Sequence, residues 1–121
     1  MVALWHIYRV NKCRHTAPPK GKYVAVVCAN PNPHGFLVNT EIANFIKNRP
    51  AFLASPVSIN ATRYSFLKHN SYVDCSRIFS FKSGELHSVQ GINNNTRTAI
   101  KRVVSTSRLI APVYRKLICG K

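Results

Sequence analysis

The sequence predicts a mostly β fold in which a small, strongly bent β-sheet or barrel is covered by a C-terminal helix. Two observations support this expectation. Before Gly91, apolar and β-branched residues gather in short runs separated by proline, glycine and asparagine, the pattern of short strands and turns. After Gly91, apolar residues recur at helical spacing instead. A length of 121 residues fits one domain, and we expect residues 1–121 to form it.

The first third of the chain predicts three strands. Residues 4–10 (LWHIYRV) alternate between two faces, as a strand does, and the polar, proline-containing stretch 11–22 predicts a basic loop. The near-continuous apolar run 23–28 (YVAVVC) predicts a central strand. Residues 29–35 (ANPNPHG) predict a turn, and residues 36–40 (FLVNT) predict a third strand. This strand could pair with the second in a hairpin across that turn.

The middle of the chain is less regular. Residues 41–48 (EIANFIKN) are compatible with either a short helix or an extended edge. Residues 51–59 are extended, but Pro56 interrupts them, so an edge strand or a broken strand is expected. Residues 64–82 hold two strand-like runs separated by the polar tripeptide KHN.

The end of the chain predicts a helix. The cluster 93–96 (NNNT) offers side chains that cap helix N-termini, and residues 95–109 carry Ile100, Val103 and Val104 on one side. Pro112 interrupts this helix, after which a last turn or two through Tyr114 and Leu117 is expected.

The charge balance points to a polyanionic partner. The chain has 18 Lys and Arg but 3 Asp and Glu, which gives a net charge of +15. Nucleic acid is the first candidate, a strongly acidic protein is the second, and a membrane surface is third because no basic amphipathic helix has a bulky apolar face. No apolar run reaches the length of a membrane span, and the apolar start lacks the features of a signal peptide. We therefore expect a cytoplasmic protein without a membrane association.

The scarcity of acids also limits the chemistry. Only Glu41, Asp74 and Glu85 are carboxylates, which argues against metal-dependent nucleases and carboxylate-pair glycosidases. The four cysteines show no C-x-x-C spacing, and the Cys13-x-His15 pair alone is weak evidence for a metal. We expect neither a metal ion nor a cofactor. Metal-free cleavage of RNA stays open, because its 2′-hydroxyl is the nucleophile and the protein need only position it, relay protons and stabilise the phosphorane.

Two short segments hold candidate site residues. Lys20 and Lys22 flank Gly21, and such a basic loop either approaches a phosphate backbone or is simply solvated. The strand 36–40 ends at Thr40, whose hydroxyl either contacts a phosphate or caps the following turn. His15 is either an acid–base group or an ordinary surface histidine.

Three segments resemble a known family, the PemK/MazF-like toxins of toxin–antitoxin systems. LWHIYRV is similar to the opening strand of the family, and KGKYVAVVC follows a basic loop as the second strand does. The most specific segment, SYVDCSRIFSF…GINNNTRTAIKRVVSTSRLI, is similar to the late strand, the glycine turn and the final helix. The resemblance covers most of the chain and is strongest at residues 71–110.

The resemblance implies a small SH3-like barrel with a C-terminal helix, and metal-independent cleavage of single-stranded RNA. It also implies a homodimer, an acidic antitoxin as partner, and an origin on a plasmid or prophage. The catalytic arginine of the family falls nearest Lys22, and its catalytic serine or threonine falls on Thr40. Arg14, Lys20, Lys22 and His15 are then expected to bind RNA.

One departure from the family keeps an alternative open. The family has an Arg-Pro pair where this chain has Lys22-Tyr23, and a lysine ammonium does not replace the planar fork of a guanidinium. The alternative is a non-catalytic basic protein of the same fold, a phage or mobile-element inhibitor that binds an acidic host protein or nucleic acid.

Overall fold

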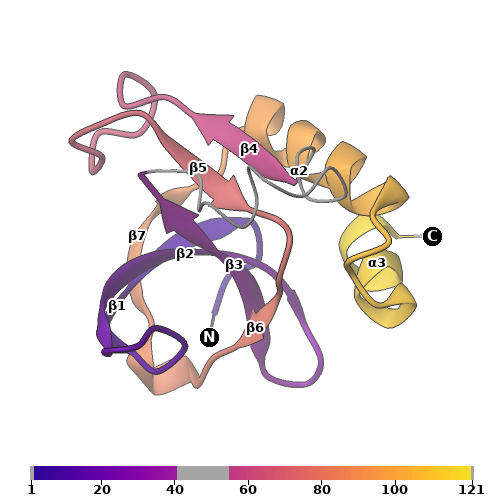
Figure 1. Cartoon of the computed structure of the whole chain (residues 1–121), viewed down its shortest axis with the longest axis horizontal. Coiled ribbons are helices and arrows are strands. Elements are labelled where there is room, and N and C mark those ends of the chain that lie inside the picture. Colours follow the sequence, from indigo (N-terminus) through magenta and orange to yellow (C-terminus); the bar gives the residue numbers. More distant parts are fainter. Residues whose placement is uncertain (1, 41–54, 121) are drawn as a thin grey trace.

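The computed structural model describes residues 2–40 and 55–120. They form a sheet of strands followed by two helices (Figure 1). The strands are β1 (His6–Cys13), β2 (Lys20–Ala29), β3 (Pro33–Asn39), β4 (Pro56–Ile59), β5 (Ser71–Asp74), β6 (Phe79–Ser80) and β7 (His87–Gly91). The helices are the 3-10 turn η2 (Ser83–Glu85), α2 (Asn94–Thr106) and α3 (Pro112–Cys119). The predicted helix or edge at 41–48 lies outside the described residues.

The sheet is antiparallel and strongly bent. Its strand order is β4-β5-β3-β2-β1-β7, and the short β6 pairs with β3 beside this path. Within the described residues, β4 and β7 lie at the two ends of the path and do not pair, so the barrel is not closed. The helices α2 and α3 lie together at one side of the sheet (Figure 1). A mostly β fold with a C-terminal helix is thereby confirmed.

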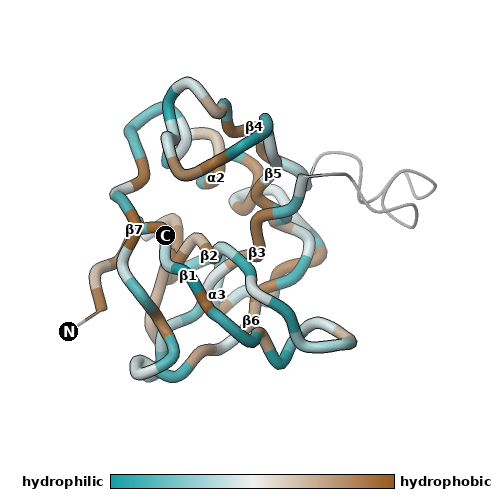
Figure 2. The backbone as a smooth tube through the Cα atoms, turned by 90° about the vertical axis from the view of Figure 1, so that its left-hand side faces the viewer, coloured by the Kyte–Doolittle hydropathy of each residue, from teal (hydrophilic) through white to brown (hydrophobic). Residues whose placement is uncertain are grey.

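The sheet is buried on both faces, because two apolar clusters form on opposite sides of β2. One cluster contains Ala25 and packs against both helices, whereas the other contains Val24 and Val26. At a β-bulge between Val26 and Cys28 the alternation stops, and Val27 and Cys28 both join the helix-side cluster. This explains why β2 reads as a continuous apolar run, and β3 carries its apolar residues in the stretch 36–38. Figure 2 colours the backbone by hydropathy.

The N-terminal hairpin differs from its prediction in length. The first strand begins at His6, because Trp5 has a left-handed backbone with φ of 58°. The polar loop expected at 11–22 is shorter, since β1 extends to Cys13 and β2 begins at Lys20. Cross-strand pairing of Cys13 with Lys20 outweighs the polar composition of this stretch.

Later elements also differ from their predictions. The turn expected at 29–35 ends earlier, because β3 begins at Pro33. The strand-like run at 64–67 forms turns instead, since Tyr64 inserts into the core and the backbone N–H of Leu67 donates to its carbonyl. Strand β7 was not predicted, and the last turn expected after Pro112 is a full helix, α3, with Pro112 in its first turn.

The segment after β4 is anchored to the start of α2. The Tyr64 hydroxyl donates to Thr96 Oγ1 at 2.7 Å and accepts from the Asn93 N–H at 3.2 Å. Asn93 caps α2 by accepting from the Thr96 N–H at 2.8 Å, as the asparagine cluster predicts. Three residues therefore form one closed ring of hydrogen bonds through side-chain and backbone groups, which fixes Tyr64 against the start of the helix.

None of the helices in the described ranges is long and apolar enough to cross a membrane.

Candidate functional site

The candidate site lies where β2 begins and β3 ends, because these two strands are neighbours. Tyr23 pairs with Val38 across the ladder, which places Lys22 beside Asn39. Successive side chains point to opposite faces of a sheet. Lys22 and Asn39 therefore share one face, whereas Tyr23, Val38 and Thr40 share the other.

Lys22 is half-buried on its face of the sheet. Its Nζ donates a hydrogen bond to Asn39 Oδ1, so the ammonium is held at the end of β3. Burial, and next the positive charge of Lys20, lower the pKa of Lys22 below its ordinary 10.5, although the Asp74 carboxylate opposes the shift. A lysine with a lowered pKa and a fixed position is suited to proton transfer as well as to charge stabilisation.

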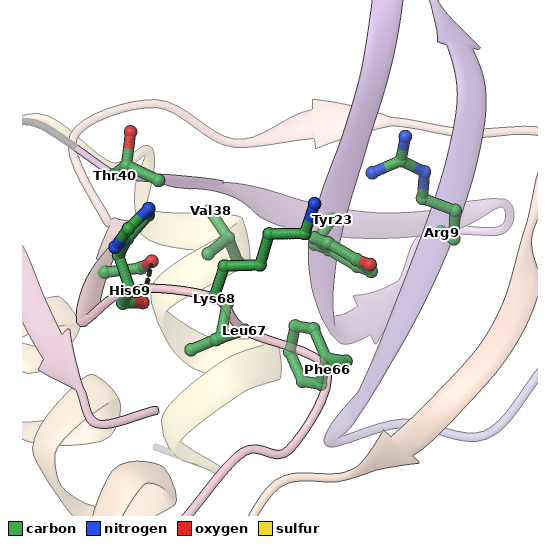
Figure 3. A pocket seen from close by; sticks show the side chains of 9 residues that line it. Arg9, Tyr23, Val38, Thr40, Phe66, Leu67, Lys68 and His69 are labelled. Atoms are coloured by element: carbon green, nitrogen blue, oxygen red, sulfur yellow. Dashed lines mark hydrogen bonds between the residues drawn. The ribbon is translucent and has the colours of Figure 1, made fainter. Parts of the chain in front are cut away.

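Thr40 opens onto a cavity of about 380 Å³ on the opposite face (Figure 3). The cavity has an aromatic wall from Tyr23 and Phe66, and Arg9 lies across from Thr40 and His69 (Figure 3). Its lining consists of Arg9, Tyr23, Val38, Thr40, Phe66, Leu67, Lys68, His69 and Ser71. It therefore combines apolar surface with three basic side chains and three hydroxyls, those of Tyr23, Thr40 and Ser71.

Arg9 reaches this cavity from β1. It pairs with Tyr23 across the β1–β2 ladder, and its guanidinium carbon lies 4.8 Å from the centre of the Tyr23 ring. The same guanidinium passes over Gly21, where a Cβ atom would lie 2.1 Å from Arg9 Nη2. Gly21 thus leaves the space that the guanidinium occupies.

The other predicted RNA-binding residues lie along the turn between β1 and β2. Lys20 is exposed at the start of β2. Arg14 forms a salt bridge with Glu85 at 3.1 Å and donates to the Ser80 carbonyl at 2.9 Å. His15 Nε2 lies 2.8 Å from the same carbonyl, and its ring stacks 4.5 Å from Phe79. Arg14 and His15 therefore fasten the turn to β6 and η2.

The predicted catalytic pair is brought to one strand end but divided between two faces. Lys22 contacts Asn39, the residue before Thr40, while Thr40 itself faces the cavity. Sequence reasoning missed Arg9 and Phe66 as members of this region. Arg9 carries no signal in the sequence beyond being a polar residue in an alternating strand, and Phe66 belongs to a run that reads as a strand.

The acids in the described residues serve the fold. Asp74 Oδ1 accepts from the N–H and hydroxyl of Ser76 and holds the turn after β5. Glu85 pairs with Arg14 and also accepts from the Lys82 N–H. No group of three or more His, Cys, Asp or Glu within the described ranges is arranged to hold a metal ion. The side chains at the strand ends are suited to binding an anion and to transferring protons.

The architecture is a MazF/PemK-like fold. In total, 26 chains of solved structures match it. Among them, the Mycobacterium tuberculosis toxin MazF-mt6 superposes with a TM-score of 0.59 at 13% sequence identity, covering 81% of this chain and 91% of that chain. No protein-family model matches the sequence, and no curated protein sequence matches it significantly. The likeness supports the expected resemblance at the level of the fold.

Proposed function

We propose that this protein is a metal-independent endoribonuclease of the toxin class that cleaves single-stranded RNA at the ends of β2 and β3. The observation that carries the proposal is the arrangement at these strand ends. A half-buried lysine of lowered pKa, Lys22, lies beside Asn39, and Thr40 follows at the rim of a basic cavity. The MazF/PemK-like fold and the net charge of +15 support the same conclusion.

The reaction needs no group beyond the RNA and the protein. The 2′-oxygen bonds to the adjacent phosphorus, the bond from phosphorus to the 5′-oxygen breaks, and the products are a 2′,3′-cyclic phosphate and a 5′-hydroxyl. One proton leaves the 2′-hydroxyl and one reaches the departing 5′-oxygen. Lys22 stabilises the negative phosphorane and exchanges one of these protons, and the Thr40 hydroxyl, on the other face of the strand end, donates to the phosphate of the neighbouring nucleotide.

RNA binding is assigned to the basic residues around this point. Lys20 and Lys22 contact phosphates next to the scissile bond, and Arg14 and His15 extend the contact along the turn while they remain fastened to Glu85 and Ser80. The proposal also includes a homodimer, an acidic antitoxin that neutralises the basic surface, and a cytoplasmic location.

A second candidate function is a non-catalytic protein of the same fold that binds an acidic protein or nucleic acid. One observation favours it. The ammonium of Lys22 already donates to Asn39, and a lysine cannot engage a phosphate with the two parallel hydrogen bonds of a guanidinium.

The two candidates separate in a cleavage assay. The purified protein is incubated with mixed single-stranded RNA in excess chelator, beside the variants Lys22→Ala, Thr40→Ala and the double substitution. Lys116→Ala, at an exposed position on α3, is the control for a lost positive charge. We expect cleavage in chelator, and a loss of about a hundredfold or more in rate when Lys22 is removed. Intact RNA, or equal cleavage by the double variant, would refute the proposal, and intact RNA with salt-sensitive binding would support the second candidate.

A further inference from the structure

We infer that the cavity on the Thr40 face binds one nucleobase of the RNA, stacked against the Tyr23 and Phe66 side chains. The inference rests on the proposed function for the identity of the ligand and adds a base-specific subsite to it. The volume of about 380 Å³ falls in the range of sites for small ligands. The cavity lies on the opposite face from Lys22, so it serves binding of a neighbouring nucleotide and not the phosphate at Lys22.

The aromatic wall has a fixed geometry. The rings of Tyr23 and Phe66 lie 4.5 Å apart at 50°, and Phe66 in turn meets Tyr64 at 6.1 Å in an edge arrangement. Tyr64 is 1% exposed and belongs to the hydrogen-bond ring at the start of α2. The wall is therefore held by both the sheet and the helix. Because its side chains are already ordered, stacking of a base costs little binding free energy for rearranging the protein.

Arg9 closes one end of the cavity with a flat cation. The guanidinium lies against the Tyr23 ring and above Gly21. Within the described residues it forms no salt bridge with a carboxylate. A guanidinium in this position is available to stack on a base or to pair with the phosphate attached to it.

The remaining lining residues suit the edge and the phosphate of a nucleotide. Lys68 and His69 are exposed at the rim, and Thr40 and Ser71 offer hydroxyls. None of the nine lining side chains is a carboxylate. An apolar floor with a basic rim fits a neutral aromatic ring that carries a phosphate, which describes a nucleotide better than it describes an acidic peptide.

Binding of two matched strands tests the inference. The probes are a short single-stranded 2′-O-methyl oligouridylate, which lacks the nucleophile and stays intact, and an abasic 2′-O-methyl strand of the same length and charge. The proteins are the wild-type chain, Phe66→Leu and Phe79→Leu. Phe79 is the matched control, because it is also half-buried but packs against His15 and Arg77 away from the cavity.

We expect the wild-type protein to prefer the base-bearing strand by about fivefold or more, the size of one stacked base. Phe66→Leu removes most of this preference and leaves the affinity for the abasic strand unchanged, whereas Phe79→Leu, which reaches RNA only through His15, retains the preference between the two strands. Equal binding of both strands by the wild-type protein would refute the inference. Tighter binding of an acidic peptide that competes at Phe66 would refute it as well.

Two further measurements keep the test decisive. If Phe66→Leu does not fold, as judged by circular dichroism, His69→Ala at the exposed rim must reduce the preference between the strands. Cleavage is measured separately on unmodified RNA. Cleavage without any base preference refutes the subsite alone, and a Phe66-dependent base preference without cleavage refutes the ribonuclease alone.

Discussion

Replacing Tyr64 with phenylalanine tests the ring of hydrogen bonds that fixes the cavity wall. The substitution removes only the hydroxyl, which donates to Thr96 Oγ1 at 2.7 Å and accepts from the Asn93 N–H at 3.2 Å. Both bonds are shielded, because Tyr64 is 1% and Thr96 7% exposed. Each bond contributes about 0.5–1.5 kcal/mol, and a buried group left unpaired adds a penalty, so we expect a loss of about 2–3 kcal/mol.

Chemical denaturation of the wild-type chain and the variant measures this loss. In thermal unfolding, a loss of about 1 kcal/mol lowers the melting temperature of a domain of this size by about 4 °C, so the melting temperature should fall by roughly 8–12 °C. Tyr72→Phe is the control, since Tyr72 is half-buried in β5 and its hydroxyl has no hydrogen-bond partner among the described residues. Combining Tyr64→Phe with Thr96→Val should cost less than the sum of the single changes, because both break the same bond. Equal stability of Tyr64→Phe and Tyr72→Phe would refute the reasoning.

Further predictions concern two glycines, a thiol and a lysine. Gly35→Ala should cost about 1–3 kcal/mol in urea denaturation, since its Cβ would lie 2.4 Å from a β2 carbonyl oxygen, whereas Gly21→Ala meets only the mobile end of Arg9 and should leave stability nearly unchanged. A large loss for Gly21→Ala would contradict this. Cys28 is 1% exposed and burial raises its pKa to about 11, so iodoacetamide should leave it unmodified at pH 8 until urea unfolds the chain, and rapid labelling of native protein would be inconsistent with its burial. Because the pKa of Lys22 is lower when folded than its unfolded value near 10.5, the unfolded chain binds more protons between these values, and stability should rise with pH across that window. Lys22→Met should flatten this rise relative to the wild-type chain, and identical pH profiles would show that Lys22 is not desolvated.

The parts of the fold that sequence patterns predict are those where one local signal dominates. The apolar run 23–28 and the asparagine cap before α2 have no competing local structure, and both form as expected. The ends of β1 and β2 depend on pairing between residues far apart in polar sequence, which composition does not reveal. The run at 64–67 has strand composition, but burial of Tyr64 against α2 determines its turns.

The candidate site likewise has a part that the sequence predicts and a part that depends on the folded sheet. Lys22 and Thr40 could be named from the sequence because a basic stretch and a strand end are both local features. The face to which each side chain points follows from the register of β2 against β3, and that register is known only from the folded sheet. Arg9 reaches the cavity because Gly21 leaves space on the neighbouring strand, a relation between two strands that no spacing in the sequence displays.

The bulge in β2 gives the two strands of the site different tolerance to changes in length. One extra residue, Val27, lies in β2 between the pairs Val26–Gly35 and Cys28–His34. A one-residue deletion within β2 can be absorbed by removing the bulge, so that Tyr23 keeps its place opposite Val38. Strand β3 has no extra residue opposite β2, so a deletion there would shift the register and turn Thr40 to the other face of the sheet. Homologous chains should therefore lose a residue from β2 more readily than from β3.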